Sequence, residues 1–166
     1  AKNMKENENY YYSGRAVFLN KEVSEKIRET QSLKTIRQFL FLLSNSKKIK
    51  DGIYFPAFSL SNKARAIVGR NWGIGKKLLL DINGFDEDYV FAAVGEDNDV
   101  EWRLIANGNK IKSMKNKTIV YHLHHPRSYS AENVKFNNEL MKKKQEENNF
   151  VCLNGIKSSS NKGPIQ

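Results

Sequence analysis

The chain has 166 residues, of which 39% are hydrophobic, and a net charge of +10 from 28 basic and 18 acidic side chains. This length and composition suit one folded domain or part of a larger one. No apolar run reaches the roughly 18 residues of a bilayer-spanning helix, and the polar N-terminus AKNMKENEN is unlike a signal peptide. The single Cys152 excludes an internal disulfide. We therefore expect a soluble, cytoplasmic protein.

The charges are divided between two neighbouring segments. Residues 47–80 contain eight Lys and Arg with Asp51 as their one acid, whereas residues 81–101 contain eight acids and no base. The basic segment either keeps the protein soluble or binds an anionic partner. With the triplet Lys142–Lys144 it could hold the protein against the inner face of an anionic membrane, although a solvated helix end explains the triplet equally well. Nucleic acid is disfavoured, because no basic-aromatic motif appears and the acidic segment would repel phosphate.

The first half of the chain begins with a strand signal. Residues 1–9 are expected to be disordered, because Met4 is their one sizeable apolar side chain. The aromatic and β-branched segment Tyr10–Leu19 predicts a strand broken at Ser13-Gly14. Asn20 or Ser24 is a candidate helix cap, and helical spacing predicts a stronger helix over residues 32–47.

Strands and helices alternate in the remainder of the chain. The expected elements are a turn at 50–52, a strand at 66–69, helices at 76–82 and 97–106, a strand at 118–123 and a helix at 131–145. Asn-Gly dipeptides at 83–84 and 107–108 stop two of the helices, because they tolerate the left-handed backbone of a helix end. Residues 155–166 are expected to form a flexible tail. The pattern predicts an α/β fold with helices packed on a small mixed sheet.

Acidic residues cluster where the helix at 97–106 begins, in the sequence VGEDNDVEWRL. If Asp97 or Asn98 caps the helix, Glu96, Asp97 and Asp99 lie near the backbone N–H groups of its first turn, which favour negative charge. Asp99 and Arg103 also have the spacing of an exposed ion pair worth roughly 0.2–0.5 kcal/mol. Function is the alternative: the small apolar residues before this point could place a carboxylate at the mouth of a pocket, where it accepts a proton from a hydroxyl.

Three histidines follow in TIVYHLHHP, residues 118–126. In a strand His122 and His124 share one face and His125 points to the other. One imidazole with carboxylates and a diphosphate would suit a divalent metal, while an ordinary hydrogen-bonded or surface cluster is the alternative. The acidic runs lack the spacing of a calcium loop, and no zinc-protease, P-loop or hydrolase-elbow motif is present.

Four segments in this order are typical of one enzyme family. They are YSGRAVFL (12–19), GRNWGIGKKLLLDINGFDEDY (69–89), GEDNDVEWRLIANG (95–108) and IVYHLHHP (119–126). Over residues 10–128 the chain resembles the C-terminal half of bacterial family-2 glycosyltransferases of the GT-A type, those with a galactosyltransferase-like C-terminal segment. The resemblance implies a partial GT-A fold whose N-terminal, nucleotide-binding half is absent.

The resemblance also implies roles for particular residues. Asp97 would be the general base and Glu96 an acceptor-binding carboxylate, as in the acidic motif of the family. Asn71 and Trp72 would line the acceptor site, and an indole face packs well on a sugar ring. Phe91–Val94 departs from the aromatic or glycine pair of the family, which leaves the acceptor undefined.

The implied cofactor is a divalent metal, Mn or Mg. His122 would complete its coordination, with His124 as the less favoured ligand. The family's D-x-D metal motif belongs to the absent half, so residues 10–154 are expected to be the acceptor-side part of a domain and inactive alone.

The implied activity is metal-dependent, inverting transfer of a sugar from a nucleotide donor to a glycan hydroxyl, in bacterial surface polysaccharide biosynthesis. The alternative is a non-catalytic carbohydrate- or anion-binding module that uses Trp72 and the basic segment.

Overall fold

The structure, a computed structural model, describes residues 9–32, 46–57, 63–91, 95–126 and 129–159. It is a mixed α/β fold with helices packed on small sheets, as the sequence predicts. The strands are β1 (Tyr10–Ser13), β2 (Arg15–Phe18), β3 (Trp72–Gly73), β4 (Lys110–Ser113) and β5 (Ile119–His122). The helices are α1 (Lys21–Thr30), the 3₁₀ helix η3 (Ile49–Gly52), α3 (Lys76–Asp81), α4 (Glu96–Ala106), α5 (Ala131–Glu146) and α6 (Ile156–Ser159).

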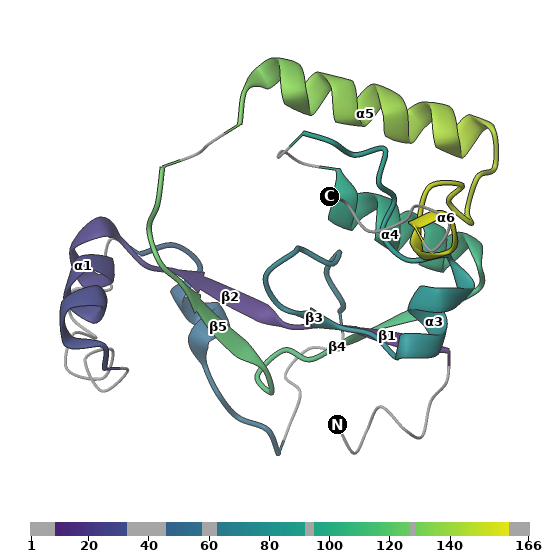
Figure 1. The fold of residues 1–166 in the computed structure, drawn as a ribbon. Helices are drawn as coiled ribbons and strands as arrows, with labels where there is room; N and C mark the ends of the chain where they lie inside the picture. Colours follow the sequence, from purple (N-terminus) through teal and green to yellow (C-terminus); the bar gives the residue numbers. More distant parts are fainter. Residues whose placement is uncertain (1–8, 33–45, 58–62, 92–94, 127–128, 160–166) are drawn as a thin grey trace.

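Two parallel strand pairs run through the centre of the fold (Figure 1). β1 pairs with β4 and β2 pairs with β5, while β3 joins the other edge of β1 in the antiparallel direction. The predicted break at Ser13-Gly14 is confirmed, because Gly14 separates β1 from β2. A Cβ at Gly14 would overlap the side chain of Asn71, so glycine is what permits this close approach.

Buried apolar side chains form two clusters. The first lies between the β1 sheet and helices α3 and α4, and consists of Tyr11, Ile67, Leu78, Ile82, Val100 and Leu104. The second packs α1 against β2, and consists of Val17, Leu19, Val23 and Ile27. Val100 and Leu104 are fully buried, and they fix α4, the helix that carries the acidic residues, against the first cluster.

The helix ends agree with the local sequence signals. Asn20 caps α1, since its side chain accepts the Val23 N–H at 2.9 Å. Just after α3, Asn83 and Gly84 have φ angles of 63° and 81°, the left-handed backbone expected there. α5 begins after Ser130, whose hydroxyl accepts a backbone N–H of the first turn at 3.2 Å. The helices predicted at 76–82 and 131–145 are confirmed to within one residue.

Three parts of the structure differ from the expectation. The strand predicted at 66–69 is an irregular segment, and β4, whose sequence KIKS is half lysine, was not predicted. Within the tail predicted at 155–166, Ile156 begins the short helix α6, and its N–H donates to the Asn83 carbonyl at 3.0 Å. Most of the helix predicted at 32–47, and residues 1–8 of the segment expected to be disordered, lie outside the described residues.

Helix α5 crosses above α4 (Figure 1) and is held by Lys144. The Lys144 Nζ lies 2.7 Å from an Asp86 oxygen and 2.6 Å from an Asp88 oxygen. Burial alone lowers the pKa of Lys144, but its hydrogen bonds to these two carboxylates raise that pKa overall. Lys142 and Lys143 remain exposed, so the triplet divides between an internal ion pair and the surface.

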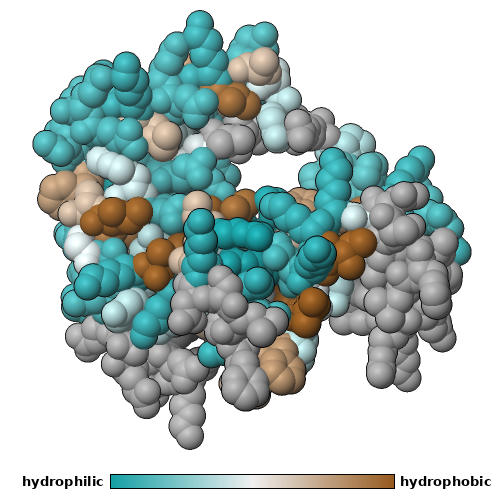
Figure 2. All heavy atoms as spheres, turned by 180° about the vertical axis from the view of Figure 1, so that it is seen from behind, coloured by the Kyte–Doolittle hydropathy of each residue, from teal (hydrophilic) through white to brown (hydrophobic). Residues whose placement is uncertain are grey.

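Figure 2 shows one face of the molecule, on which hydrophilic side chains dominate and hydrophobic ones form small, separate groups among the coloured atoms. In the part of the chain that the structure describes, none of the helices combines the length and the apolar character needed to cross a bilayer.

Candidate functional site

Helix α4 begins one residue earlier than predicted, and its N-cap is Gly95 instead of Asp97 or Asn98. Gly95 has a φ angle of 151°, and a Cβ there would lie 3.0 Å from a side chain of α5. Glycine therefore permits both the backbone conformation and the close contact. Glu96, Asp97 and Asp99 all fall in the first turn, where the helix dipole favours negative charge.

Two carboxylates of α4 hold the segment that precedes β3. The Gly69 N–H donates to Asp97 Oδ2 at 2.8 Å, and the Ile67 N–H donates to Glu101 Oε2 at 3.2 Å. The Tyr11 hydroxyl donates to the other oxygen of Glu101 at 3.4 Å. Burial raises the pKa of Glu101, and the nearby charge of Asp97 adds to this. Asp97 and Glu101 bind backbone groups that strand pairing would otherwise use, which explains why this segment is not a strand.

Asp97 is half-exposed and its neighbour Glu96 is exposed. The second oxygen of Asp97, Oδ1, accepts the Asn98 N–H at 2.8 Å, so each oxygen receives one backbone donor. A carboxylate has about four lone-pair sites, and both oxygens therefore keep capacity to accept a further hydrogen bond. The backbone contacts orient the group while leaving it reachable from solvent. This arrangement suits the predicted general base.

The ion pair that the spacing of Asp99 and Arg103 suggested is present, but both side chains are fully buried instead of exposed. The Arg103 Nε donates to Asp99 Oδ2 at 2.7 Å, and the Tyr89 hydroxyl donates to Oδ1 at 3.1 Å. Arg103 also donates to the carbonyls of Ile82 and Gly84, each at 2.8 Å. Burial raises the pKa of Asp99, and the charge of Arg103 opposes that effect. Asp99 therefore joins α4 to the end of α3 and does not face solvent.

The two residues predicted to line the acceptor site sit side by side next to the β1–β2 junction. The Asn71 amide donates to the carbonyls of Arg15 at 2.7 Å and Thr118 at 3.3 Å, so its nitrogen ties the segment to β2 and to the residue just before β5. Trp72 is half-buried on β3, and its ring stands edge-on to Phe85 at 6.2 Å between centroids. Asn71 has a clear structural role, and Trp72 packs in part against the first apolar cluster.

The histidines are arranged differently from the expected strand pattern. β5 ends at His122, whose ring centroid lies 5.1 Å from that of His125. His124 is exposed and docks on α1 through its backbone: its N–H donates to Ser24 Oγ at 2.8 Å, and its carbonyl accepts from Arg28 at 2.6 Å. The chain leaves the sheet after His122, so the alternation of a continued strand does not apply. His125, and not His124, is the ring that neighbours His122.

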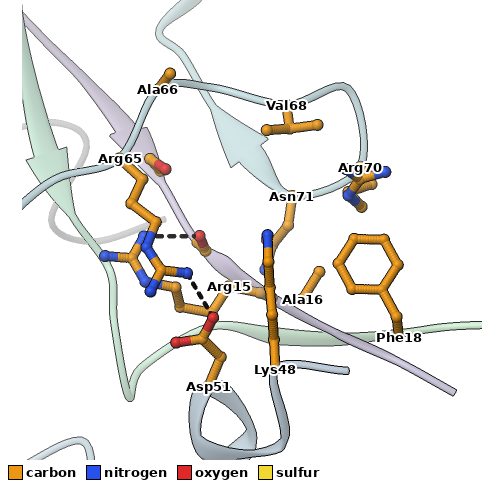
Figure 3. A pocket seen from close by; sticks show the side chains of 12 residues that line it. Arg15, Ala16, Phe18, Lys48, Asp51, Arg65, Ala66, Val68, Arg70 and Asn71 are labelled. Atoms are coloured by element: carbon orange, nitrogen blue, oxygen red, sulfur yellow. Dashed lines mark hydrogen bonds and ion pairs between the residues drawn. The ribbon is translucent and has the colours of Figure 1, made fainter. Parts of the chain in front are cut away.

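A path of contacts connects Asp97 with His122. Gly69 bonds to Asp97, and the guanidinium of the next residue, Arg70, lies 4.7 Å from the centroid of the Phe18 ring (Figure 3). The Phe18 ring lies 5.2 Å from the His122 ring. Burial lowers the pKa of His122, and the positive charge of Arg70 adds to this. The lowered pKa favours the neutral imidazole, the form that binds metals.

The described residues do not form a metal site by themselves. Among them no group of three or more His, Cys, Asp or Glu side chains is placed to hold a metal ion. His122 has the protonation state of a ligand, but its neighbour Arg70 is a cation that repels a bare metal ion.

A basic cavity that the sequence did not predict lies beside this path, between β2, η3 and residues 65–71 (Figure 3). The charged residues that line it are Arg15, Lys48, Asp51, Arg65 and Arg70. The signal for it in the sequence is weak. Arg15 alternates with Val17 and Leu19 along β2 and shares their buried face, where a charged side chain is unexpected.

Comparisons of the chain with family models, with curated proteins and with solved structures give no match. The interpretation of this site therefore depends on the residues and the geometry described above.

Proposed function

We propose that the chain is the acceptor-side part of a bacterial, inverting glycosyltransferase of the GT-A type, which acts in surface polysaccharide biosynthesis. The observation that supports this most is the setting of Asp97. Its carboxylate stands at the N-terminus of α4, is oriented by the N–H groups of Gly69 and Asn98, and stays half-exposed. The mixed α/β fold is compatible with the proposal.

In this proposal Asp97 accepts the proton of the attacking acceptor hydroxyl. The new bond forms between that oxygen and the anomeric carbon as the bond to the nucleoside diphosphate breaks on the opposite face, which inverts the configuration. The bonding electrons leave with the diphosphate, and the proton stays on Asp97. A positioned base of this kind contributes about 10²–10⁴-fold to a rate.

Three other side chains belong to the proposed acceptor site. Glu96 is exposed one residue from Asp97, and it would bind acceptor hydroxyls. Trp72 is partly exposed, and its indole would pack on a sugar ring. Asn71 would contribute mainly by fixing the segment that carries Trp72, because its amide nitrogen already bonds to two carbonyls.

The proposed cofactor is a divalent metal, Mn or Mg, which would stabilise the charge of the diphosphate. His122 would hold it through a neutral imidazole, and the remaining ligands would come from the donor and from the nucleotide-binding half that the resemblance implies.

The proposed partners are a nucleotide sugar and a glycan acceptor, and nucleic acid is not expected. We place the enzyme in the cytoplasm, with peripheral contact to the inner face of the membrane. Lys144 does not support that contact because it is buried, and Lys142 and Lys143 lie 3.7 and 3.9 Å from Glu146 and Glu147. Membrane contact would therefore depend on the basic segment 47–80.

Substitution of Asp97 by asparagine in the intact enzyme tests the proposal. The introduced amide keeps one carbonyl oxygen to accept the Gly69 N–H but cannot take a proton, so turnover should fall by about 10²–10⁴-fold with donor affinity unchanged. Asp81→Asn is the matched control, because Asp81 is an exposed acid of the neighbouring helix that pairs with Lys77 at 2.9 Å. Equal turnover of Asp97→Asn and Asp81→Asn would contradict the role of Asp97.

A non-catalytic carbohydrate-binding module is the competing class. Titration of the chain with glycans distinguishes the two, because such a module binds glycan without nucleotide or metal and shows no transfer when joined to its upstream sequence.

A further inference from the structure

The basic cavity has an unusual balance of charge. Four cationic side chains line it, from Arg15, Lys48, Arg65 and Arg70, and Asp51 is the one acid among its lining residues. Asp51 is buried, and Arg65 Nη1 lies 2.5 Å from its Oδ2. Within the described residues the other three cations have no carboxylate within ion-pairing distance. One acid is therefore left to balance four cations.

Arg15 is the most constrained of these cations. It is 3% exposed, and its guanidinium donates to neutral oxygens: the Gly14 carbonyl at 3.1 Å, the Lys63 carbonyl at 3.0 Å and the Ser113 hydroxyl at 3.3 Å. Its Nε is buried and has no hydrogen-bond partner among the described residues. Burial lowers the pKa of Arg15, and the adjacent charge of Arg65 adds to this. A buried charge with an unsatisfied donor is costly unless an anion binds to it.

Two further cations converge on the same space from the opposite side (Figure 3). The Lys48 Nζ lies 5.2 Å and the Arg70 guanidinium 4.7 Å from the centroid of the Phe18 ring. The ring attracts both cations, and both line the same cavity as Arg15. An anion bound in this cavity would be attracted by all three positive charges.

We propose that this cavity is a binding site for a phosphoryl oxyanion. The cavity encloses about 50 Å³, room for a small group and not for a whole nucleotide. Guanidinium groups present several donors in the planar arrangement that phosphate oxygens match, and Lys48 adds a point charge. The site contains neither Asp97 nor His122, and the proposal holds whether or not the chain takes part in sugar transfer.

Isothermal titration of the chain with inorganic phosphate, in metal-free buffer of low ionic strength, tests the proposal. We expect saturable binding that weakens as salt is added. Lys48→Gln should weaken it about tenfold, because one charge-assisted contact is lost. Lys47→Gln is the matched control: it removes the same charge from the adjacent exposed residue, which does not line the cavity, and should leave the affinity within about twofold.

Three further titrations decide the chemistry of the site. Asp51→Asn, in protein shown to be folded by circular dichroism, should bind phosphate several-fold more tightly, because it removes the one acid and releases Arg65. Pyrophosphate in place of phosphate tests whether the source is a diphosphate, and glucuronate tests a carboxylate. Absence of saturable binding, equal effects of Lys48→Gln and Lys47→Gln, or tighter binding of glucuronate than of phosphate would each overturn the proposal.

Discussion

Replacement of Arg103 by methionine tests whether the buried ion pair with Asp99 stabilises the first turn of α4. Arg103 and Asp99 are both fully buried, with 2.7 Å between Nε and Oδ2, and Arg103 also donates to two carbonyls at 2.8 Å. Met fills much of the space but donates no hydrogen bond, so Asp99 keeps the Tyr89 hydroxyl as its remaining side-chain donor. Removing one partner of a buried ion pair costs about 3–5 kcal/mol, and we expect that loss in the free energy of unfolding.

Urea denaturation followed by circular dichroism measures this loss. Lys77→Met is the control, because Lys77 pairs with Asp81 at the same i,i+4 spacing on an exposed surface, and its loss should cost about 0.5 kcal/mol or less. A cost for Arg103→Met within about 1 kcal/mol of that control would refute the interpretation of Asp99–Arg103 as a buried, stabilising network.

The stability lost in Arg103→Met should depend on pH in a direction that follows from the pKa of Asp99. Burial raises the pKa of Asp99 in the folded protein. Above that pKa the buried, charged carboxylate lowers the free energy of unfolding, and below the pKa of Asp99 in the unfolded chain this loss of stability disappears. Without Arg103 the pKa of Asp99 should rise further. The difference in free energy of unfolding between the wild type and Arg103→Met should therefore become smaller as the pH is lowered from neutral toward the ordinary pKa of aspartate.

Two further predictions concern the segment that carries Asn71. Gly14→Ala should destabilise the protein by about 1–3 kcal/mol in thermal unfolding, because the new methyl group overlaps the Asn71 side chain. Gly75→Ala is the control and should change the stability little, because its Cβ would have no atom within 4 Å. Equal effects of the two substitutions would contradict the close approach of Gly14 to Asn71. Arg70→Gln should raise the pKa of His122 in an NMR titration, because one of the causes of its lowering is removed, and an unchanged value would show that Arg70 does not act on this ring.

The sequence predicted element ends correctly where the end is determined by residues close to it in the chain. The break at Gly14, the Asn20 cap and the Asn83-Gly84 helix stop each follow from backbone preferences that act over a few positions. The strand predicted at 66–69 failed because α4, about thirty residues further along, takes its backbone donors. β4 was missed because its pairing with the buried strand β1, and not its own lysine-rich sequence, makes it a strand.

The candidate site was predictable in its residue types but not in its contacts. The i,i+4 spacing of Asp99 and Arg103 indicates an ion pair, yet spacing alone carries no information on burial. The acidic cluster pointed to Asp97, while its bond to Gly69 depends on how two distant segments pack. The basic segment 47–80 supplies Lys48, Arg65 and Arg70 of the basic cavity, but the cavity itself was not predicted, because only the fold brings these residues together with Arg15 of β2.

We propose that Asp97 both orients the Gly69 segment and acts as a base. The most direct measurement combines the turnover of Asp97→Asn in the intact enzyme with the amide chemical shift of Gly69 in the same variant. We predict that the Gly69 N–H stays hydrogen-bonded, because the single carbonyl oxygen of the introduced amide turns to it and gives up the Asn98 N–H, together with a fall in turnover of about 10²–10⁴-fold. Full turnover, or a fall in turnover accompanied by loss of the Gly69 hydrogen bond, would contradict a role of Asp97 in proton transfer.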